Sequence, residues 1–140
     1  MIRPQARARR AHGFTLIEML MACAVAAALA AVALPFYRQR ALHAGRIDAV
    51  AALMKVQTAQ EQYRSLHGMY ATDLSPLIGT AALSPQSLYA VTLERTAAEA
   101  YVATATAQGR QADDKGCKAM TLSVQLGFPT EGPTPECWQR

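Results

Sequence analysis

Residues 13–37 read GFTLIEMLMACAVAAALAAVALPFY, and this stretch decides the fold. After the glycine only Thr15 and Glu18 are polar, and residues 19–37 form an unbroken apolar run. An α-helix rises about 1.5 Å per residue, so a run of this length covers the hydrocarbon core of a bilayer, which is about 30 Å thick. The stretch therefore predicts one membrane-spanning helix over residues 14–37.

The segment before this helix carries the chain's excess of positive charge. The 140 residues contain 14 Lys and Arg against 10 Asp and Glu, and four of the arginines lie in residues 1–13. The rest of the chain is therefore neutral. A basic segment beside an apolar run stays on the cytoplasmic side of a membrane. We expect residues 38–140 to face the periplasm.

Residues 38–66 change from wholly apolar to amphipathic. Apolar residues recur at steps of three and four, which is the period of an α-helix with one buried face: Ile47, Val50 and Met54, and Leu53, Val56 and Tyr63. Gly45 costs such a helix only about 1 kcal/mol relative to Ala. If it is tolerated, one continuous helix of about 80 Å extends from about residue 14 to residue 66.

Three later segments alternate apolar with small or polar residues, as strands with one buried face do: residues 88–94, 100–107 and 119–126. They predict a small antiparallel β-sheet covered by the helix over residues 38–66, which is an α+β fold. The composition, 51% hydrophobic and 17% charged, excludes a disordered chain. The tail over residues 127–140 contains three prolines and is expected to be irregular.

The segment Gly13-Phe14-Thr15-Leu16-Ile17-Glu18, between a basic leader and an apolar run, resembles the prepilin signal of type IV pilins and of type II secretion pseudopilins. The resemblance implies a type IV pilin fold and a leader peptide over residues 1–13. It also implies that a prepilin peptidase cuts after Gly13 and that Phe14 becomes the N-methylated first residue. Residues 38–140 would then form the periplasmic domain.

Two further residues of the apolar stretch take a role from this resemblance. An ionised acid in the apolar zone needs a partner, because at the bilayer centre it costs about 2.5–3.5 kcal/mol. We expect Glu18 to pair with the new α-amine of Phe14 in a neighbouring subunit. Pro35 removes a backbone donor and frees the carbonyl of Ala31, which predicts a kink there.

The chain has three cysteines, of which Cys23 lies in the apolar run as a small apolar residue. Cys117 and Cys137 would face the oxidising periplasm, and their separation resembles the C-terminal disulfide loop of type IV pilins. We therefore expect a disulfide between them. The enclosed loop is either an interaction site or a clasp that fixes the C-terminus, and the two roles are compatible.

Nothing in the sequence predicts catalysis, a cofactor or a metal. It contains no nucleophile–base spacing, no Gly-rich phosphate loop and no paired His ligands. Asp113, Asp114 and Glu99 are weak candidates for a calcium loop, and a polar turn is the favoured interpretation.

DNA contact has weak support from the sequence. Four basic residues lie between residues 70 and 138, namely Arg95, Arg110, Lys115 and Lys118. So few charges give weak, salt-sensitive phosphate binding, and a solvated turn is favoured.

Together these features are interpreted as a small or minor type IV pilin. Its partners would be other pilin subunits, the prepilin peptidase, the inner membrane and the pilus assembly machinery. The roles implied by the resemblance are pilus assembly, twitching motility, adhesion or DNA uptake.

A type II secretion pseudopilin is the alternative within the family. A periplasmic binding or enzymatic domain with an ordinary secretory signal is the alternative from another class, because Ala31-Val32-Ala33 resembles a signal-peptidase site. Glu18 at the start of the apolar stretch argues against it.

Overall fold

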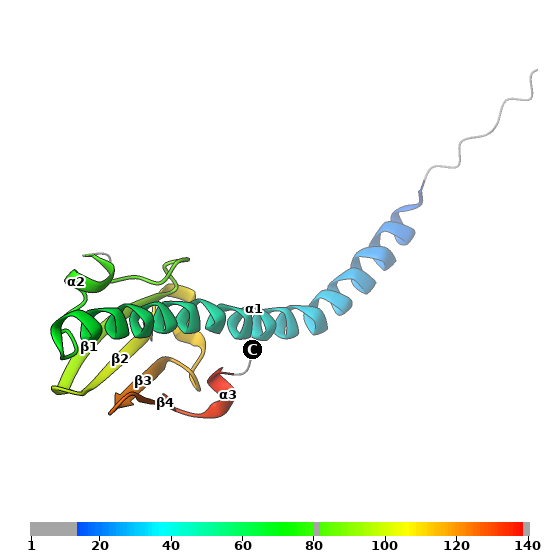
Figure 1. The fold of residues 1–140 in the computed structure, drawn as a ribbon. Coiled ribbons are helices and arrows are strands. Elements are labelled where there is room, and N and C mark those ends of the chain that lie inside the picture. The colour runs from blue at the N-terminus through cyan, green and yellow to red at the C-terminus, as the bar shows by residue number, and fades with distance from the viewer. Residues whose placement is uncertain (1–13, 80–81, 139–140) are drawn as a thin grey trace, which may run out of the picture. The chain divides into compact units, whose positions relative to one another are not determined.

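The computed structural model describes residues 14–79 and 82–138, and the predicted leader lies outside this part of the chain. Its first element is a single helix, α1, over Leu16–His67 (Figure 1). The continuous helix expected from the sequence is therefore confirmed, with Pro35 and Gly45 both inside it. Contacts divide the chain into two units, Met1–Tyr37 and Arg38–Arg140, and each is described by itself.

In the first unit the apolar side chains of α1 are exposed all around the helix. Every described residue from Phe14 to Tyr37 is exposed. The helix contains an 18-residue window with a mean hydropathy of 2.3, none of it buried. By length and composition α1 is therefore long and apolar enough to cross a membrane.

The second unit contains a four-stranded antiparallel sheet with the order β1-β2-β3-β4. The strands are β1 (Tyr89–Ala97), β2 (Ala100–Ala107), β3 (Ala119–Gln125) and β4 (Phe128–Gly132). The second predicted strand has the observed bounds, and the third ends one residue earlier than expected. β1 continues three residues beyond the predicted end, because its pairing with β2 extends to the hairpin turn.

The C-terminal tail differs from the prediction of irregular structure. It forms β4 and a short helix, α3, over Pro135–Trp138. β4 is the outermost strand and pairs only with β3, so Pro129 occupies an edge position, where a residue without an N–H group is tolerated. Two more short helices, α2 (Ser75–Ile78) and the 3-10 helix η1 (Gly109–Asp113), lie in stretches expected to be loop or turn.

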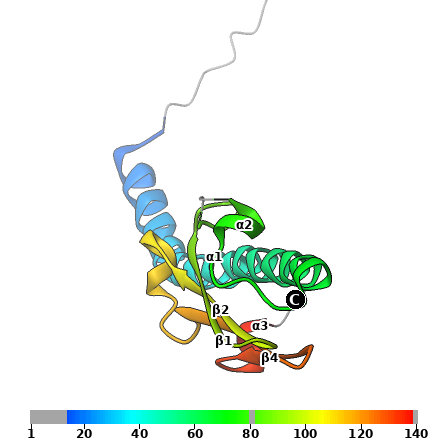
Figure 2. The ribbon, with the colours of Figure 1, turned by 60° about the vertical axis from the view of Figure 1, so that its left-hand side comes forward.

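The core lies between the second unit's part of α1 and one face of the sheet, as the views in Figures 1 and 2 agree. Along β2 every second residue is buried, from Tyr101 to Ala107, which confirms the predicted half-buried sheet. On α1 the predicted buried stripe is confirmed at Leu53 and Val56, and it is wrong at Ile47, which is 59% exposed. The buried residues of α1 are mainly small or branched: Gly45, Asp48, Ala49, Ala52, Leu53, Val56 and Gln60.

Candidate functional site

The start of α1 forms a reciprocal cap between Thr15 and Glu18. The Thr15 backbone N–H and hydroxyl both donate to Oε2 of Glu18 at 2.8 Å, and the Glu18 N–H donates to the Thr15 hydroxyl at 3.3 Å. This is the capping-box arrangement of a Thr followed three residues later by a Glu. Sequence reasoning missed this partner for Glu18, although the Thr-x-x-Glu pattern carries the signal.

The other predicted residues of the N-terminal segment keep the status of predictions. Gly13 lies outside the described residues, and the Phe14 side chain is 84% exposed. Pairing of Glu18 with the Phe14 amine of another subunit and a kink at Pro35 stay predictions as well. The cap leaves Oε1 of Glu18 without a partner in the described part of this chain.

A disulfide joins Cys117 to Cys137, as predicted. It connects the segment that leads into β3 with α3. The neighbouring Trp138 is buried, and its indole N–H donates to the Gly132 carbonyl at 2.8 Å. The described end of the chain is therefore fixed to the sheet, which agrees with the clasp interpretation, while Glu131 and residues 133–136 are exposed.

Three of the four predicted basic residues gather on the connection between β2 and β3, residues 108–118. Arg110 lies in η1, and Lys115 and Lys118 lie between η1 and β3; all three are exposed. Arg95 is not among them, because it donates to the Tyr70 carbonyl at 3.0 Å near the other end of β1. The sequence-based grouping around one turn is thus confirmed for three residues.

A second loop, residues 82–88 before β1, lies beside this connection. The N–H of Gln108 donates to the Leu88 carbonyl at 2.7 Å. Gln86 and Ser87 are exposed in this loop, and Ser87 has a positive φ of 57°. We call six exposed basic and uncharged polar residues of the two segments the basic face: Gln86, Ser87, Gln108, Arg110, Lys115 and Lys118.

Residues 42–48 of α1 form hydrogen bonds with both segments that carry the basic face. The Asp48 carboxylate, 3% exposed, accepts hydrogen bonds from the Ser84 hydroxyl, the Gln86 N–H at 2.9 Å and the Leu88 N–H at 3.3 Å. These bonds satisfy the buried charge, which would otherwise be costly. They also fix the path of the loop before β1.

Arg46 anchors the β2–β3 connection, as Asp48 anchors the loop before β1. Its guanidinium donates to both carboxylate oxygens of Asp114, at 2.7 and 3.0 Å, and to the Glu136 carbonyl at 3.2 Å. The hydrogen bond to Asp114 raises the pKa of Arg46. The pair neutralises the charge of Asp114, which is buried. Asp113 is the one exposed acid within residues 108–118.

Gly45 completes the stretch by making room for Gln111. A Cβ atom at position 45 would lie 2.8 Å from Cδ of Gln111. The Gln111 amide instead reaches the helix and donates to the Leu42 carbonyl at 2.8 Å and to the Tyr89 hydroxyl at 3.0 Å. Sequence reasoning treated Gly45 as merely tolerated and missed Arg46, Asp48 and Gln111. The signal for Asp48 was a carboxylate on the apolar stripe, four residues before Ala52.

The acidic residues considered for calcium do not come together. Glu99 precedes β2 and Asp113 follows it, so they lie at opposite ends of that strand, and Asp114 is paired with Arg46. Within the described residues no group of three His, Cys, Asp or Glu side chains is placed to hold a metal ion.

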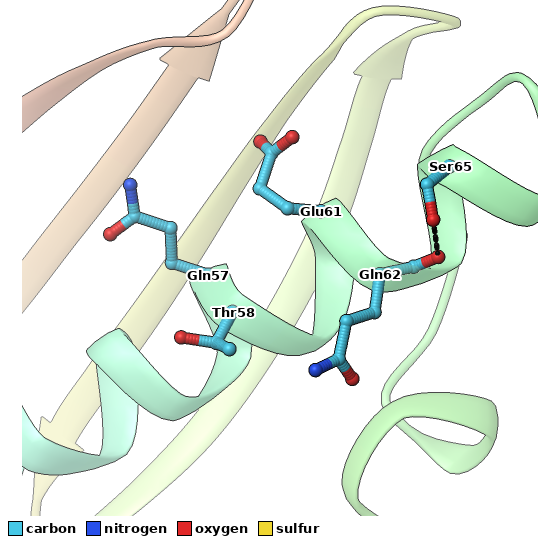
Figure 3. A pocket seen from close by; sticks show the side chains of 5 residues that line it. All are labelled: Gln57, Thr58, Glu61, Gln62 and Ser65. Carbon is cyan, nitrogen blue, oxygen red and sulfur yellow. Dashed lines mark hydrogen bonds between the residues drawn. The ribbon is translucent and has the colours of Figure 1, made fainter.

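The exposed side of α1 has shallow hollows. The one in Figure 3, of about 500 Å³, is lined by Gln57, Thr58, Glu61, Gln62 and Ser65. Gln57 and Glu61 extend from the same side of the helix, one turn apart, and the Ser65 hydroxyl donates to the Gln62 carbonyl (Figure 3). The lining side chains do not form a nucleophile–base pair.

Three tyrosines lie fully buried in the second unit. Burial is the main cause that raises the pKa of Tyr70, Tyr89 and Tyr101. Tyr70 donates to Glu61 at 2.7 Å and Tyr89 accepts from Gln111. Of the buried side-chain polar atoms in the described residues, only the Tyr101 hydroxyl has no hydrogen-bond partner.

Two family models match adjacent parts of the chain. A model described as the prokaryotic N-terminal methylation motif matches residues 8–34. A model described as type IV minor pilin ComP, DNA uptake sequence receptor, matches residues 35–121, which is more than half of the chain. No curated protein matches it.

Proposed function

The chain belongs to the family described as type IV minor pilin ComP, DNA uptake sequence receptor, and from this premise we propose that it is a processed pilus subunit that contacts DNA during uptake. The observation that carries the proposal is the family match over residues 35–121, joined directly to the methylation motif. With this membership the pilin interpretation is confirmed, and the pseudopilin and secreted-domain alternatives lose their support. The family implies a structural role, and we propose no catalysis.

Maturation would follow the methylation motif. The prepilin peptidase would remove residues 1–13 on the cytoplasmic face, and Phe14 would then be N-methylated. The apolar part of α1 would hold the subunit in the inner membrane with the second unit in the periplasm, before the subunit enters a filament. Mass spectrometry of the processed protein tests this: we expect a methylated Phe14 at the N-terminus, and an N-terminus at Leu34 would contradict it.

Assembly would depend on the negative charge of Glu18, which pairs with the Phe14 amine of a neighbouring subunit, as well as on the cap that Glu18 forms with Thr15. Glu18→Gln keeps a side chain that can complete a capping box but removes the charge that pairs with an amine. We expect at least a tenfold loss of this chain from sheared filaments, with the membrane pool unchanged. Thr15→Ala is the matched control, because it removes the hydroxyl of the cap and keeps the carboxylate. Equal incorporation of the Glu18→Gln subunit would refute the pairing.

DNA contact would occur on the basic face. Three exposed cations with one exposed acid beside them form a local positive field, and Gln86, Ser87 and Gln108 add hydrogen-bonding groups that reach toward bases or sugars. A phosphate contact contributes about 0.9 to the slope of log K against log salt. The few cations therefore predict a shallow salt dependence of about three at most.

The test is fluorescence anisotropy of the full processed chain in detergent micelles with a labelled mixed-sequence duplex. Replacing Arg110, Lys115 and Lys118 together with Gln should abolish binding at about 200 mM salt. Lys55→Gln removes an exposed cation of α1 that is not part of the basic face; this variant is the control and should bind like the unaltered chain. Equal loss in both variants would show unspecific attraction and would count against the basic face.

A further inference from the structure

We propose that residues 42–48 of α1 position the basic face and set its charge, so that Gly45, Arg46 and Asp48 govern DNA affinity without contacting DNA. This inference rests on the DNA contact proposed above. Its basis is a juxtaposition: one short stretch of helix holds both segments that carry the exposed cations and amides.

The loop before β1 depends on Asp48 for its shape. Three donors from Ser84, Gln86 and Leu88 converge on one buried carboxylate, and the Ser84 hydroxyl in turn accepts the Tyr89 N–H at 2.9 Å. Ser87 stands between two of the anchored residues in a left-handed conformation that non-glycine residues rarely adopt. The anchors hold it there and direct Gln86 and Ser87 outward.

The β2–β3 connection depends on Arg46 and Gln111. Arg46 holds Asp114 by two hydrogen bonds, and Gln111 fills the space above Gly45 and bonds to the Leu42 carbonyl. Because the Gln108 N–H is bonded to the Leu88 carbonyl, the two segments form one surface. A surface held in its bound shape loses less conformational entropy on binding, which favours affinity.

Arg46 also determines the charge that DNA meets. Within residues 108–118 the three cations are opposed by Asp113 and Asp114. Pairing with Arg46, whose side chain is 18% exposed, cancels Asp114 at the base of the surface. Without Arg46 the Asp114 carboxylate would be an unpaired negative charge beneath Lys115, and it would repel phosphate.

Variants at Arg46 and Asp114 separate the effect of holding the β2–β3 connection in place from the effect of neutralising Asp114. Arg46→Gln loses both effects, whereas the double variant Arg46→Gln/Asp114→Asn loses the ion pair but leaves no unpaired acid. We expect the double variant to bind the mixed-sequence duplex about tenfold more weakly than the unaltered chain, and Arg46→Gln more weakly still. The slope of log K against log salt should stay unchanged in the double variant, because the phosphate contacts are the same. Lys118→Gln is the contrasting control and should lower that slope by about one.

Amide hydrogen exchange in residues 84–88 and 108–118 of the full processed chain gives a readout that does not need DNA. We expect faster exchange there in the double variant and in Asp48→Asn, which preserves side-chain size, while the strands keep their protection. Binding of the double variant equal to that of the unaltered chain would overturn the inference, and so would unchanged exchange in both variants. Failure of the unaltered chain to bind DNA would instead refute the proposed function, and the exchange data would still report whether residues 42–48 hold the loops.

Discussion

At the scale of single residues, Gly45 shows how a missing side chain determines a contact. Glycine is a poor helix former, so its place inside α1 has a cost of about 1 kcal/mol relative to Ala. The space above it is filled by Gln111, whose amide satisfies the buried Tyr89 hydroxyl and a helix carbonyl. The local cost is offset by a contact between residues that are far apart in the sequence.

We therefore expect Gly45→Ala to destabilise the protein despite the better helix propensity of Ala. The added Cβ would displace Gln111 and leave buried polar groups without partners, at a cost of about 1–3 kcal/mol. Thermal unfolding followed by circular dichroism measures the effect. Gly116→Ala is the control, since a Cβ there meets no atom within 4 Å. An unchanged or higher melting temperature for Gly45→Ala would contradict this account.

The buried tyrosines predict a loss of stability in alkali. Burial raises the pKa of Tyr70, Tyr89 and Tyr101 in the folded chain, whereas a tyrosine in the unfolded chain ionises near pH 10. Stability is therefore complete below about pH 10 and is lost as the pH rises toward the folded-state values. Each tyrosine that stays protonated lowers the free energy of unfolding by about 1.4 kcal/mol per pH unit in that range.

Urea unfolding at a series of pH values, with phenolate absorbance as the second signal, checks this. Tyr101→Phe should leave stability at neutral pH nearly unchanged, because the Tyr101 hydroxyl makes no hydrogen bond within the described residues, and it should flatten the alkaline loss. Titration of Tyr70, Tyr89 and Tyr101 near pH 10 in a protein that stays folded would disprove the prediction.

At the scale of elements, the periodic segments were predictable and the edge of the sheet was not. The period of α1 and the alternation in β2 come from which face is buried, so the sequence predicts them directly. Almost all of β4 is exposed, so it has no such alternation, and its proline argues against a strand unless its edge position is known.

The edge position of Pro129 leads to a prediction about aggregation. An unpaired edge strand attracts the edges of other chains, and a proline there removes one of the donors that such pairing needs. Pro129→Thr restores that donor with a strong strand former, and we expect soluble aggregates at concentrations where the unaltered chain is monodisperse. Light scattering on detergent-solubilised protein measures this. Phe128→Thr introduces the same residue but adds no donor, because Phe128 already has a backbone N–H group, and this variant should not aggregate.

The candidate site was predicted in part, for a similar reason. The basic turn can be read from residue types and local spacing, and the cysteine pair was expected from the resemblance to type IV pilins. The contacts of residues 42–48 cannot, because Arg46 and Asp114 are separated by 68 positions and the Gln111–Leu42 bond by 69. Only the packing of α1 on the sheet brings such residues together, and a single sequence carries no direct signal for it.

At the scale of the whole molecule, charge is divided between the leader and the rest. The complete chain has an isoelectric point of about 9.2, yet residues 14–140 contain ten basic and ten acidic side chains. Processing after Gly13 should therefore shift the isoelectric point from strongly basic to near neutral. Isoelectric focusing of protein from cells with and without the prepilin peptidase tests this, and equal values in both would refute cleavage at this position.

The arrangement of α1 beneath the basic face limits how the two can be exchanged between proteins. A chimaera that transplants only the segment from Ser84 to Lys118 onto the helix of another pilin would carry the surface without its support. The donor's Gly45, Arg46 and Asp48 would have to travel with the loops. The loops proposed to contact DNA and the helix segment that holds them therefore have to be transferred together.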